Sequence, residues 1–334
     1  MKNKKILIVG GCGFIGHNLA LHLKKQDHKV YVVDSLGVNN ILSFTDTDIV
    51  NKKLYRAILN NRIEMLSEND INLIVQDARD YHAICKLYDE IDPDIIIHLA
   101  AVSHANKSNK DPHSTFDHSF RTLENTLDFA RVKNIQVIYL SSSLVYGNFI
   151  EGMVDEKTNC NPIGIYGNLK YSGELLIKSY NQVFDLPFTI IRPSALYGER
   201  CVSRRVGQIF IENALQGTDI TINGDGEDEL DFTYIEDLVS GISLCCSNNK
   251  SINETFNITY GRSKKINDLL AILKKEFPKV KVSYKEREKF MPQRGTLNVD
   301  KAKKLIGYKP LNSIEVGYIK YINWYKGFWQ NLKK

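Results

Sequence analysis

Six short runs of apolar, mostly β-branched residues recur through the first part of the chain, with amphipathic stretches between them. They cover residues 5–9, 30–33, 73–75, 95–97, 137–140 and 188–191. Each run is almost continuously apolar rather than alternating, which is typical of strands covered on both faces in a parallel sheet. Strands and helices that alternate in this way are joined by right-handed crossovers. The sequence therefore predicts an α/β fold built on a doubly wound parallel sheet.

Composition and charge exclude several classes of protein. Of the 334 residues, 43% are hydrophobic and 25% charged, which is typical of globular proteins and excludes disorder. The apolar runs are far shorter than the roughly 20 residues that span a membrane. The net charge of +5 is spread along the chain, so we expect neither nucleic acid nor a membrane as a partner.

Two further features bear on metal binding and location. No Cys or His cluster has the spacing of a metal site, so no metal is expected. The apolar stretch that follows the basic residues 2–5 ends at Val9, too early for a signal peptide, so we expect a cytoplasmic protein.

A glycine-rich turn, residues 10–16, follows the first apolar run and precedes an amphipathic stretch. Gly10, Gly13 and Gly16 allow a tight turn that brings the backbone close to a pyrophosphate, at the positive end of a helix. Asp34 ends the second run, 18 residues after Gly16, where a carboxylate binds the adenosine ribose hydroxyls. The pattern predicts a Rossmann domain that binds NAD rather than NADP, because a carboxylate at this place repels a 2′-phosphate.

The second half of the chain lacks the regular alternation. Residues 219–231 are rich in Gly, Asp and Glu and are expected to form a loop, whereas 266–277 and 314–329 predict helices. We expect residues 1–192 to form the NAD-binding domain, with 231–262 returning to it. Residues 193–334 should form mainly a smaller α/β substrate lobe.

A candidate redox centre combines a Tyr-x-x-x-Lys pair with a serine triplet. Tyr166 and Lys170 would project from the same face of a helix, where the ammonium favours the phenolate and lowers the pKa of Tyr166. Such a tyrosine can exchange a hydroxyl proton while hydride moves to or from a nicotinamide. The triplet Ser141–Ser143 follows the fifth apolar run, at the edge of the sheet where ligands bind.

These landmarks together resemble the extended short-chain dehydrogenase/reductases, specifically their nucleotide-sugar epimerase and dehydratase group. The resemblance runs over about residues 5 to 330 and rests on the motifs at 10–16, 34, 76–80, 98–101, 141–147, 166–170, 191–198, 231–237 and 301–310.

The resemblance implies roles for individual residues. Ser142, Tyr166 and Lys170 would be catalytic. The cofactor would be bound by Gly10, Gly13, Phe14, Ile15, Gly16, Asp34, Asp77, Ala78, Leu99, Ala100, Ala101, Ser141, Tyr166, Lys170 and Pro193. The substrate would contact Ser103, His104, Ser142, Ser143, Arg200, Arg204 and Arg294.

The same resemblance separates the possible reactions. The 4,6-dehydratases of the group carry an acid and a base where this chain has Ser143 and Leu144, and leucine exchanges no proton. We therefore expect an NAD-dependent epimerase that oxidises a hydroxyl of a nucleotide-diphosphate sugar, at C4, to a ketone and returns the hydride. A dehydrogenase or ketoreductase with net redox turnover, a 4,6-dehydratase-like enzyme and an idle NAD-binding scaffold stay as alternatives.

Some substrate positions depart from the group. Ala195 replaces a usual Asn, and Leu230 replaces a usual diphosphate-binding Arg, for which Arg200, Arg204 and Arg205 could substitute. His118 also stands where the group often has Asn. The group further implies a homodimer, formed by the helix after Pro112 and the helix that carries Tyr166.

Overall fold

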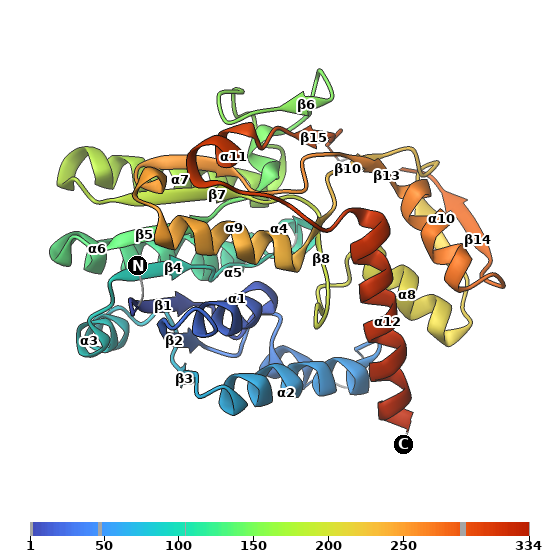
Figure 1. The fold of residues 1–334 in the computed structure, drawn as a ribbon, viewed down its shortest axis with the longest axis horizontal. Coiled ribbons are helices and arrows are strands. Elements are labelled where there is room, and N and C mark those ends of the chain that lie inside the picture. Colours follow the sequence, from blue (N-terminus) through green and yellow to red (C-terminus); the bar gives the residue numbers. More distant parts are fainter. Residues whose placement is uncertain (1–2, 46–48, 104, 288–291, 334) are drawn as a thin grey trace.

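A seven-stranded parallel sheet forms the centre of the molecule (Figure 1). The computed structural model describes residues 3–45, 49–103, 105–287 and 292–333. The strand order is β12-β7-β5-β4-β1-β2-β3. The strands are β1 (Lys5–Val9), β2 (Lys29–Asp34), β3 (Asn72–Val75), β4 (Ile95–His98), β5 (Gln136–Leu140), β7 (Phe188–Arg192) and β12 (Glu254–Asn257). The six predicted strands are confirmed, and β12 adds a seventh.

Both faces of this sheet are covered, as the continuous apolar runs predicted. In β1, Ile6 and Ile8 enter one hydrophobic core, while Leu7 and Val9 enter another on the opposite face. Side chains alternate between the two faces of a strand, so a doubly covered strand is apolar at most of its positions. Burying one such side chain fully contributes about 1.5–3 kcal/mol.

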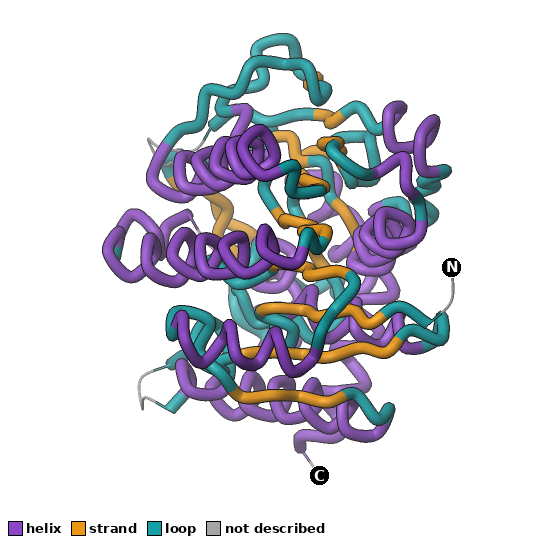
Figure 2. Tube along the Cα trace, turned by 90° about the vertical axis from the view of Figure 1, so that its left-hand side faces the viewer, coloured by secondary structure: helices purple, strands orange, loops and turns teal. Residues whose placement is uncertain are grey.

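Two sets of helices provide this cover, and Figure 2 shows helices on both sides of the strands. Buried residues of α1 (Phe14–Lys24), α2 (Lys52–Glu68) and α9 (Ile235–Ser247) share the core of Ile6 and Ile8. Those of α3 (Tyr81–Ile91), α6 (Thr122–Lys133) and α7 (Gly164–Phe184) share the core of Leu7 and Val9. The predicted doubly wound architecture is confirmed.

The helix predicted after Pro112 is interrupted by a wider turn. Asp111 caps α5 (Pro112–Phe116) by accepting a hydrogen bond from Ser114 N at 3.0 Å. A π-helical segment (Asp117–Arg121) follows and leads into α6. Such segments insert an extra residue and often occur at functional sites.

A smaller lobe lies at one end of the sheet (Figure 1). It contains α8 (Val206–Gln216), α10 (Ile266–Glu276) and α12 (Ile314–Lys333), so both predicted helices are confirmed. The loop prediction for 219–231 is wrong in part, because β9 (Ile220–Asn223) and β10 (Glu229–Leu230) lie within it. They pair with the distant β14 (Val282–Lys285) and β13 (Lys264–Lys265) respectively, and such pairing leaves no local signal.

Residues 231–262 contribute to the main sheet as well as to the lobe. Strand β12 pairs in parallel with β7, and α9 packs beside α1. The predicted division into domains at residue 192 stays a prediction. None of the described helices is both long and apolar enough to cross a bilayer.

The remaining elements are short. They are η1 (Ile41–Phe44), α4 (Ala105–Lys110), η3 (Ser143–Tyr146), β6 (Met153–Val154), β8 (Leu196–Tyr197), β11 (Thr233–Tyr234), η4 (Asn249–Ser251), β15 (Thr296–Leu297) and α11 (Asp300–Ile306).

The contact between Gly11 and Gly16 gives a testable prediction. A Cβ atom added at Gly16 would lie 2.5 Å from Gly11 O, so Gly16→Ala must displace α1 from the glycine turn. We expect a loss of about 1–3 kcal/mol in unfolding free energy. The matched control is Gly327→Ala in α12, where a Cβ meets nothing within 4 Å and should stabilise the helix by about 0.5–1 kcal/mol. Denaturant unfolding measures both, and equal effects of the two changes would contradict the account.

Candidate functional site

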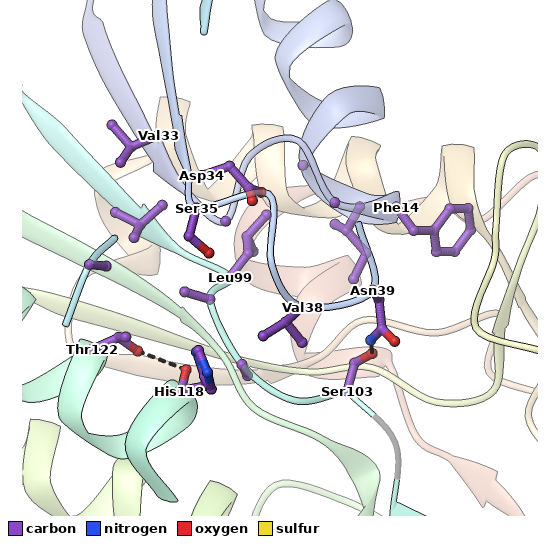
Figure 3. Close-up of a pocket in the computed structure, with 18 of the residues that line it drawn as sticks. Phe14, Val33, Asp34, Ser35, Val38, Asn39, Leu99, Ser103, His118 and Thr122 are labelled. Carbon is purple, nitrogen blue, oxygen red and sulfur yellow. Dashed lines mark hydrogen bonds between the residues drawn. The ribbon is translucent and has the colours of Figure 1, made fainter. Parts of the chain in front are cut away.

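A pocket opens above the carboxyl ends of β1, β2 and β4 (Figure 3). The loops after these strands, the start of α1 and the π-helical segment surround it, together with Val202, Ser203 and Arg205. Its lining includes the predicted cofactor residues Gly10, Gly13, Phe14, Ile15, Gly16, Asp34, Asp77, Ala78, Leu99, Ala100 and Ala101. The structure therefore brings together the residues predicted to hold the dinucleotide's adenosine and pyrophosphate.

The glycine turn provides close backbone approach and free donors. Gly10 has φ +78°, and a Cβ there would lie 2.8 Å from Ala100 N, so only glycine fits. Helix α1 begins after Gly13 without any side-chain cap. Its first N–H groups are therefore available to an anion at the positive end of the helix. This geometry fits the pyrophosphate of NAD.

Asp34 lies at the wall of the pocket, at the end of β2. Its Oδ2 accepts a hydrogen bond from Cys12 N at 3.0 Å, and its Oδ1 accepts one from Leu36 N at 2.7 Å. Burial raises the pKa of Asp34, while these two N–H groups and the charge of Arg62 lower it. The carboxylate is thus fixed at the glycine turn, where it can accept hydrogen bonds from ribose hydroxyls.

Arg62 is a pocket residue that the sequence analysis missed. Its side chain is only 1% exposed and lines the same pocket. Nε donates to Arg200 O at 3.1 Å, a second nitrogen donates to the same oxygen, and NH1 donates to Cys12 O at 3.5 Å. Arg62 thus joins the glycine turn to the loop that follows β8. Its spacing of four from the buried Ile58 and Leu66 could have placed it on the buried face of α2.

At the opposite end of the pocket, Asp77 is held by an ion pair. Arg79 donates to both carboxylate oxygens, with NH2 at 2.7 Å from Oδ2, and also contacts Asp117 at 2.8 Å. The hydrogen bonds from Arg79 lower the pKa of Asp77. His118 and Thr122 line the wall here (Figure 3). His118 was noted in the sequence only as a departure from the group.

The candidate redox residues gather beyond this pocket, around the ends of β5 and β7. Ser142 caps the turn η3, and its Oγ accepts a hydrogen bond from Leu144 N at 3.2 Å. Tyr166 lies in the first turn of α7. Burial raises the pKa of Tyr166, while the positive charge of Arg205 and a hydrogen bond with Ser142 lower it.

Lys170 is held at the end of β5. Its Nζ donates to Leu140 O at 2.6 Å and lies 4.9 Å from the centre of the Tyr139 ring. Burial lowers the pKa of Lys170 to about 7. Arg205 is the cation that lowers the pKa of Tyr166 here, and the predicted acidification of Tyr166 by Lys170 stays a prediction.

The neighbouring serines and Pro193 support this centre through backbone contacts. Ser141 N donates to Ile191 O at 2.8 Å, and Ser143 N donates to Pro193 O at 2.9 Å. Both serines are almost completely buried. Ser143 is thus placed to hold the two strand ends together. Its predicted contact with substrate stays a prediction.

Two cations lie near each other, and one of them, Arg205, acts on Tyr166. Arg205 lines the pocket, and its Nε is buried without a hydrogen-bond partner. Burial and the nearby charge of Arg205 lower the pKa of Arg294 to about 10. Within the described residues, neither guanidinium forms an ion pair within 4.0 Å, although Asp228 acts on Arg294 from farther away. Two adjacent cations without a paired carboxylate are suited to an anionic ligand.

The other predicted substrate residues are distributed differently. Arg200 Nε donates to Asn61 at 2.9 Å, and Arg204 NH1 donates to the hydroxyl of Tyr55 at 3.5 Å. Both arginines therefore contact α2 and do not line the dinucleotide pocket, and their predicted contact with substrate stays a prediction. Ser103 does line the pocket, and its hydroxyl accepts a hydrogen bond from Asn39 at 3.1 Å (Figure 3). His104 lies outside the described residues.

Comparison with known proteins agrees with this geometry. The model of the NAD dependent epimerase/dehydratase family matches residues 6–259. UDP-glucuronate 4-epimerase 1 of Arabidopsis thaliana is 28% identical over 347 residues, covering 97% of this chain and 77% of that protein.

Two solved structures resemble the whole fold. One is the UDP-glucuronic acid 4-epimerase of Bacillus cereus with UDP-glucuronic acid and NAD, with TM-score 0.87 and 27% identity. The other is the UDP-glucose 4-epimerase of Thermotoga maritima with UDP-glucose, with TM-score 0.84 and 26% identity. Each match covers 97% of this chain and 99% of the other.

Arg62 gives the testable prediction of this site. Arg62→Met removes the donors to Cys12 O and Arg200 O and should lower the unfolding free energy by about 1–3 kcal/mol, because buried acceptors lose their partner. It should also weaken NAD binding, measured by calorimetric titration. Arg56→Met, on the exposed face of the same helix, is the control. Unchanged stability and affinity in Arg62→Met would refute this role.

Proposed function

We propose that this chain inverts C4 of a UDP-sugar. It belongs to the NAD-dependent epimerase/dehydratase family, which is part of the extended short-chain dehydrogenase/reductases. It is an NAD-dependent nucleotide-sugar epimerase. The observation that carries the choice of substrate is the pair Arg205 and Arg294, two neighbouring cations of which Arg205 acts on Tyr166. Relatives named as 4-epimerases of UDP-glucose and UDP-glucuronate support the choice of UDP and C4.

The residues of the dinucleotide pocket would hold NAD. The N-terminus of α1 would bind the pyrophosphate, and Asp34 would bind the adenosine ribose. When bound, NAD supplies the acceptor and donor of the hydride. The protein's own part is to orient the sugar and to move a proton.

Tyr166 would exchange that proton, with Ser142 as its partner. Ser142 would hydrogen-bond the sugar hydroxyl, and Tyr166, as phenolate, would accept its proton and later return it to the ketone oxygen. The configuration inverts when the hydride returns to the opposite face of that carbon. Because burial raises the pKa of Tyr166, the phenolate needs nearby positive charge, and Arg205 provides part of it. Lys170 would add charge and bind the nicotinamide ribose.

The side chain of Leu144 restricts what else the site can do. Leu144 follows Ser143 in the turn η3 and is partly buried. A leucine can neither donate nor accept a proton, so the elimination of water from the sugar lacks its acid and base. This favours return of the hydride to the same sugar, which is epimerisation.

We also propose a homodimer in a reducing compartment such as the cytoplasm. Exposed apolar side chains lie on α6 and α7, namely Val132, Leu175, Val183 and Phe184. These are the helices that the family resemblance assigns to the dimer. All six cysteines are free, which supports a reducing environment.

The activity can be tested with UDP-glucose, UDP-galactose, UDP-glucuronate and their N-acetylated counterparts. We expect one pair to interconvert without added NADH, as followed by proton NMR of the products. Tyr166→Phe should lower kcat by at least about 100-fold, whereas Tyr171→Phe on the same helix should not. Formation of a 4-keto-6-deoxy sugar, or stoichiometric NADH with no epimer, would contradict the proposal.

The two cations give a separate prediction for substrate binding. Arg205→Met and Arg294→Met should each raise KM about tenfold to a hundredfold, because each removes a charge-assisted hydrogen bond to the diphosphate. Arg204→Met is the matched control, since its guanidinium points to Tyr55. A larger effect of the Arg204 variant on KM would show that the diphosphate binds elsewhere.

The homodimer is tested by light scattering. We expect a particle of twice the chain mass of 38.2 kDa. Val183→Glu should convert the dimer to a monomer, because it places a charge in the apolar contact. Leu311 is 80% exposed and lies far from these helices in the chain, so Leu311→Glu should leave the dimer intact. A wild-type monomer would refute the proposal.

A further inference from the structure

Glu174 is a completely buried carboxylate that the proposed mechanism does not use. It lies on α7, four residues after Lys170 and eight after Tyr166, and is 0% exposed. Residues four apart share one face of a helix. Tyr166, Lys170 and Glu174 therefore form one stripe along α7, which faces the ends of β5 and β7.

Three hydrogen bonds join Glu174 to these strand ends. Arg192, at the end of β7, donates from Nε to Oε1 at 2.9 Å and from NH2 to Oε2 at 2.6 Å. The hydroxyl of Ser141, just after β5, donates to Oε1. Ser141 precedes Ser142, and Arg192 precedes Pro193. One carboxylate thus links the helix of the Tyr-Lys pair to both segments that carry the other site residues.

The titratable groups packed around this link are neutral near pH 7. Burial lowers the pKa of His98 on β4 to about 3, and it raises the pKa of Tyr139 on β5. It also raises the pKa of Tyr146, whose ring lies 4.8 Å from the Arg192 guanidinium, and that of Cys160.

Three charged residues form the centre of this link. Lys170 and Arg192 are the cations, and Glu174 is the anion that acts on both. Arg192 competes with Lys170 for this carboxylate, and it holds both oxygens.

We propose that Glu174 is a positioning residue for the redox step, which keeps Lys170 protonated and holds the Ser142 and Pro193 segments in register. The inference rests on the proposed function, because it takes Lys170 and Ser142 as working groups of the site. It adds a residue that touches neither sugar nor cofactor yet sets the pH range in which the site works.

The physical reason lies in the cost of burying the Lys170 ammonium. Burial alone lowers the pKa of Lys170, to about 7, and the charge of Glu174 acts in the opposite direction. Without that charge the pKa falls further, and the ammonium is lost at neutral pH. Activity that needs a protonated Lys170 is present below its pKa and disappears as the pH rises through it.

The test is the pH dependence of kcat/KM for the NAD-loaded enzyme with the UDP-sugar that it turns over. Glu174→Gln should move the alkaline midpoint down by about one pH unit or more. Above the midpoint it should lose about tenfold in kcat/KM, and below it activity should return. Arg192→Gln breaks the same ion pair but leaves the carboxylate facing Lys170, so its midpoint should lie at or above the wild-type value.

The double variant Glu174→Gln, Arg192→Gln is the control for misfolding of the single variants. It replaces the ion pair by two amides and leaves no buried charge unpaired. Its midpoint should fall as in Glu174→Gln, because the anion is gone. An unmoved midpoint in both Glu174 variants, or an equal fall in Arg192→Gln, would overturn the inference.

Lys170→Met separates this failure from failure of the proposed function. If Lys170→Met abolishes turnover while the Glu174 variants keep the wild-type midpoint, only the role of Glu174 is refuted. If Lys170→Met stays fully active, the proposed function of Lys170 is itself wrong, and the inference falls with it.

Discussion

The covering of one parallel sheet on both faces is the constraint on which the rest of this structure depends. Alternate residues of β1 enter two separate hydrophobic cores, so polar groups have no place between Ile6 and Val9. They come instead after the carboxyl ends, as Asp34 does at the end of β2 and Ser142 just after β5. The dinucleotide pocket and the redox centre therefore share one edge of the sheet.

Charges at this edge are arranged so that several cations are buried and few anions compensate them. Arg62 satisfies its donors with carbonyl oxygens, Lys170 bonds to Leu140 O, and Arg205 leaves one buried nitrogen unpaired. Buried cations without carboxylates are costly in a free protein, and an anionic ligand removes that cost. A dinucleotide together with a diphosphate sugar is a ligand set of this kind.

Local patterns in the sequence predicted the parts of the fold that local interactions decide. The apolar runs, the glycine turn and the aspartate after β2 each lie within a few residues of the element they define. Strands β9 and β10 were missed because they pair with segments far along the chain. Arg62 was missed for a similar reason: only the packing of α2 against the glycine turn brings its side chain into the pocket.

The sequence pattern also did not predict how individual side chains are oriented. The spacing of four predicted that Lys170 and Tyr166 share a face of α7, but it did not show that a backbone carbonyl and a tyrosine ring on β5 hold the ammonium. Similarly, three arginines stand close together at 200, 204 and 205, and the loop directs only Arg205 into the pocket. Which member of such a cluster reaches the site depends on loop conformation, which the sequence pattern leaves open.

A crystal structure of the protein with NAD and UDP would test the central claim most directly. The account predicts the dinucleotide above the glycine turn, with the Tyr166 hydroxyl facing the reactive carbon of the nicotinamide. It also predicts the diphosphate of UDP between Arg205 and Arg294. A dinucleotide bound elsewhere, or a Tyr166 hydroxyl that points away from the nicotinamide, would contradict it.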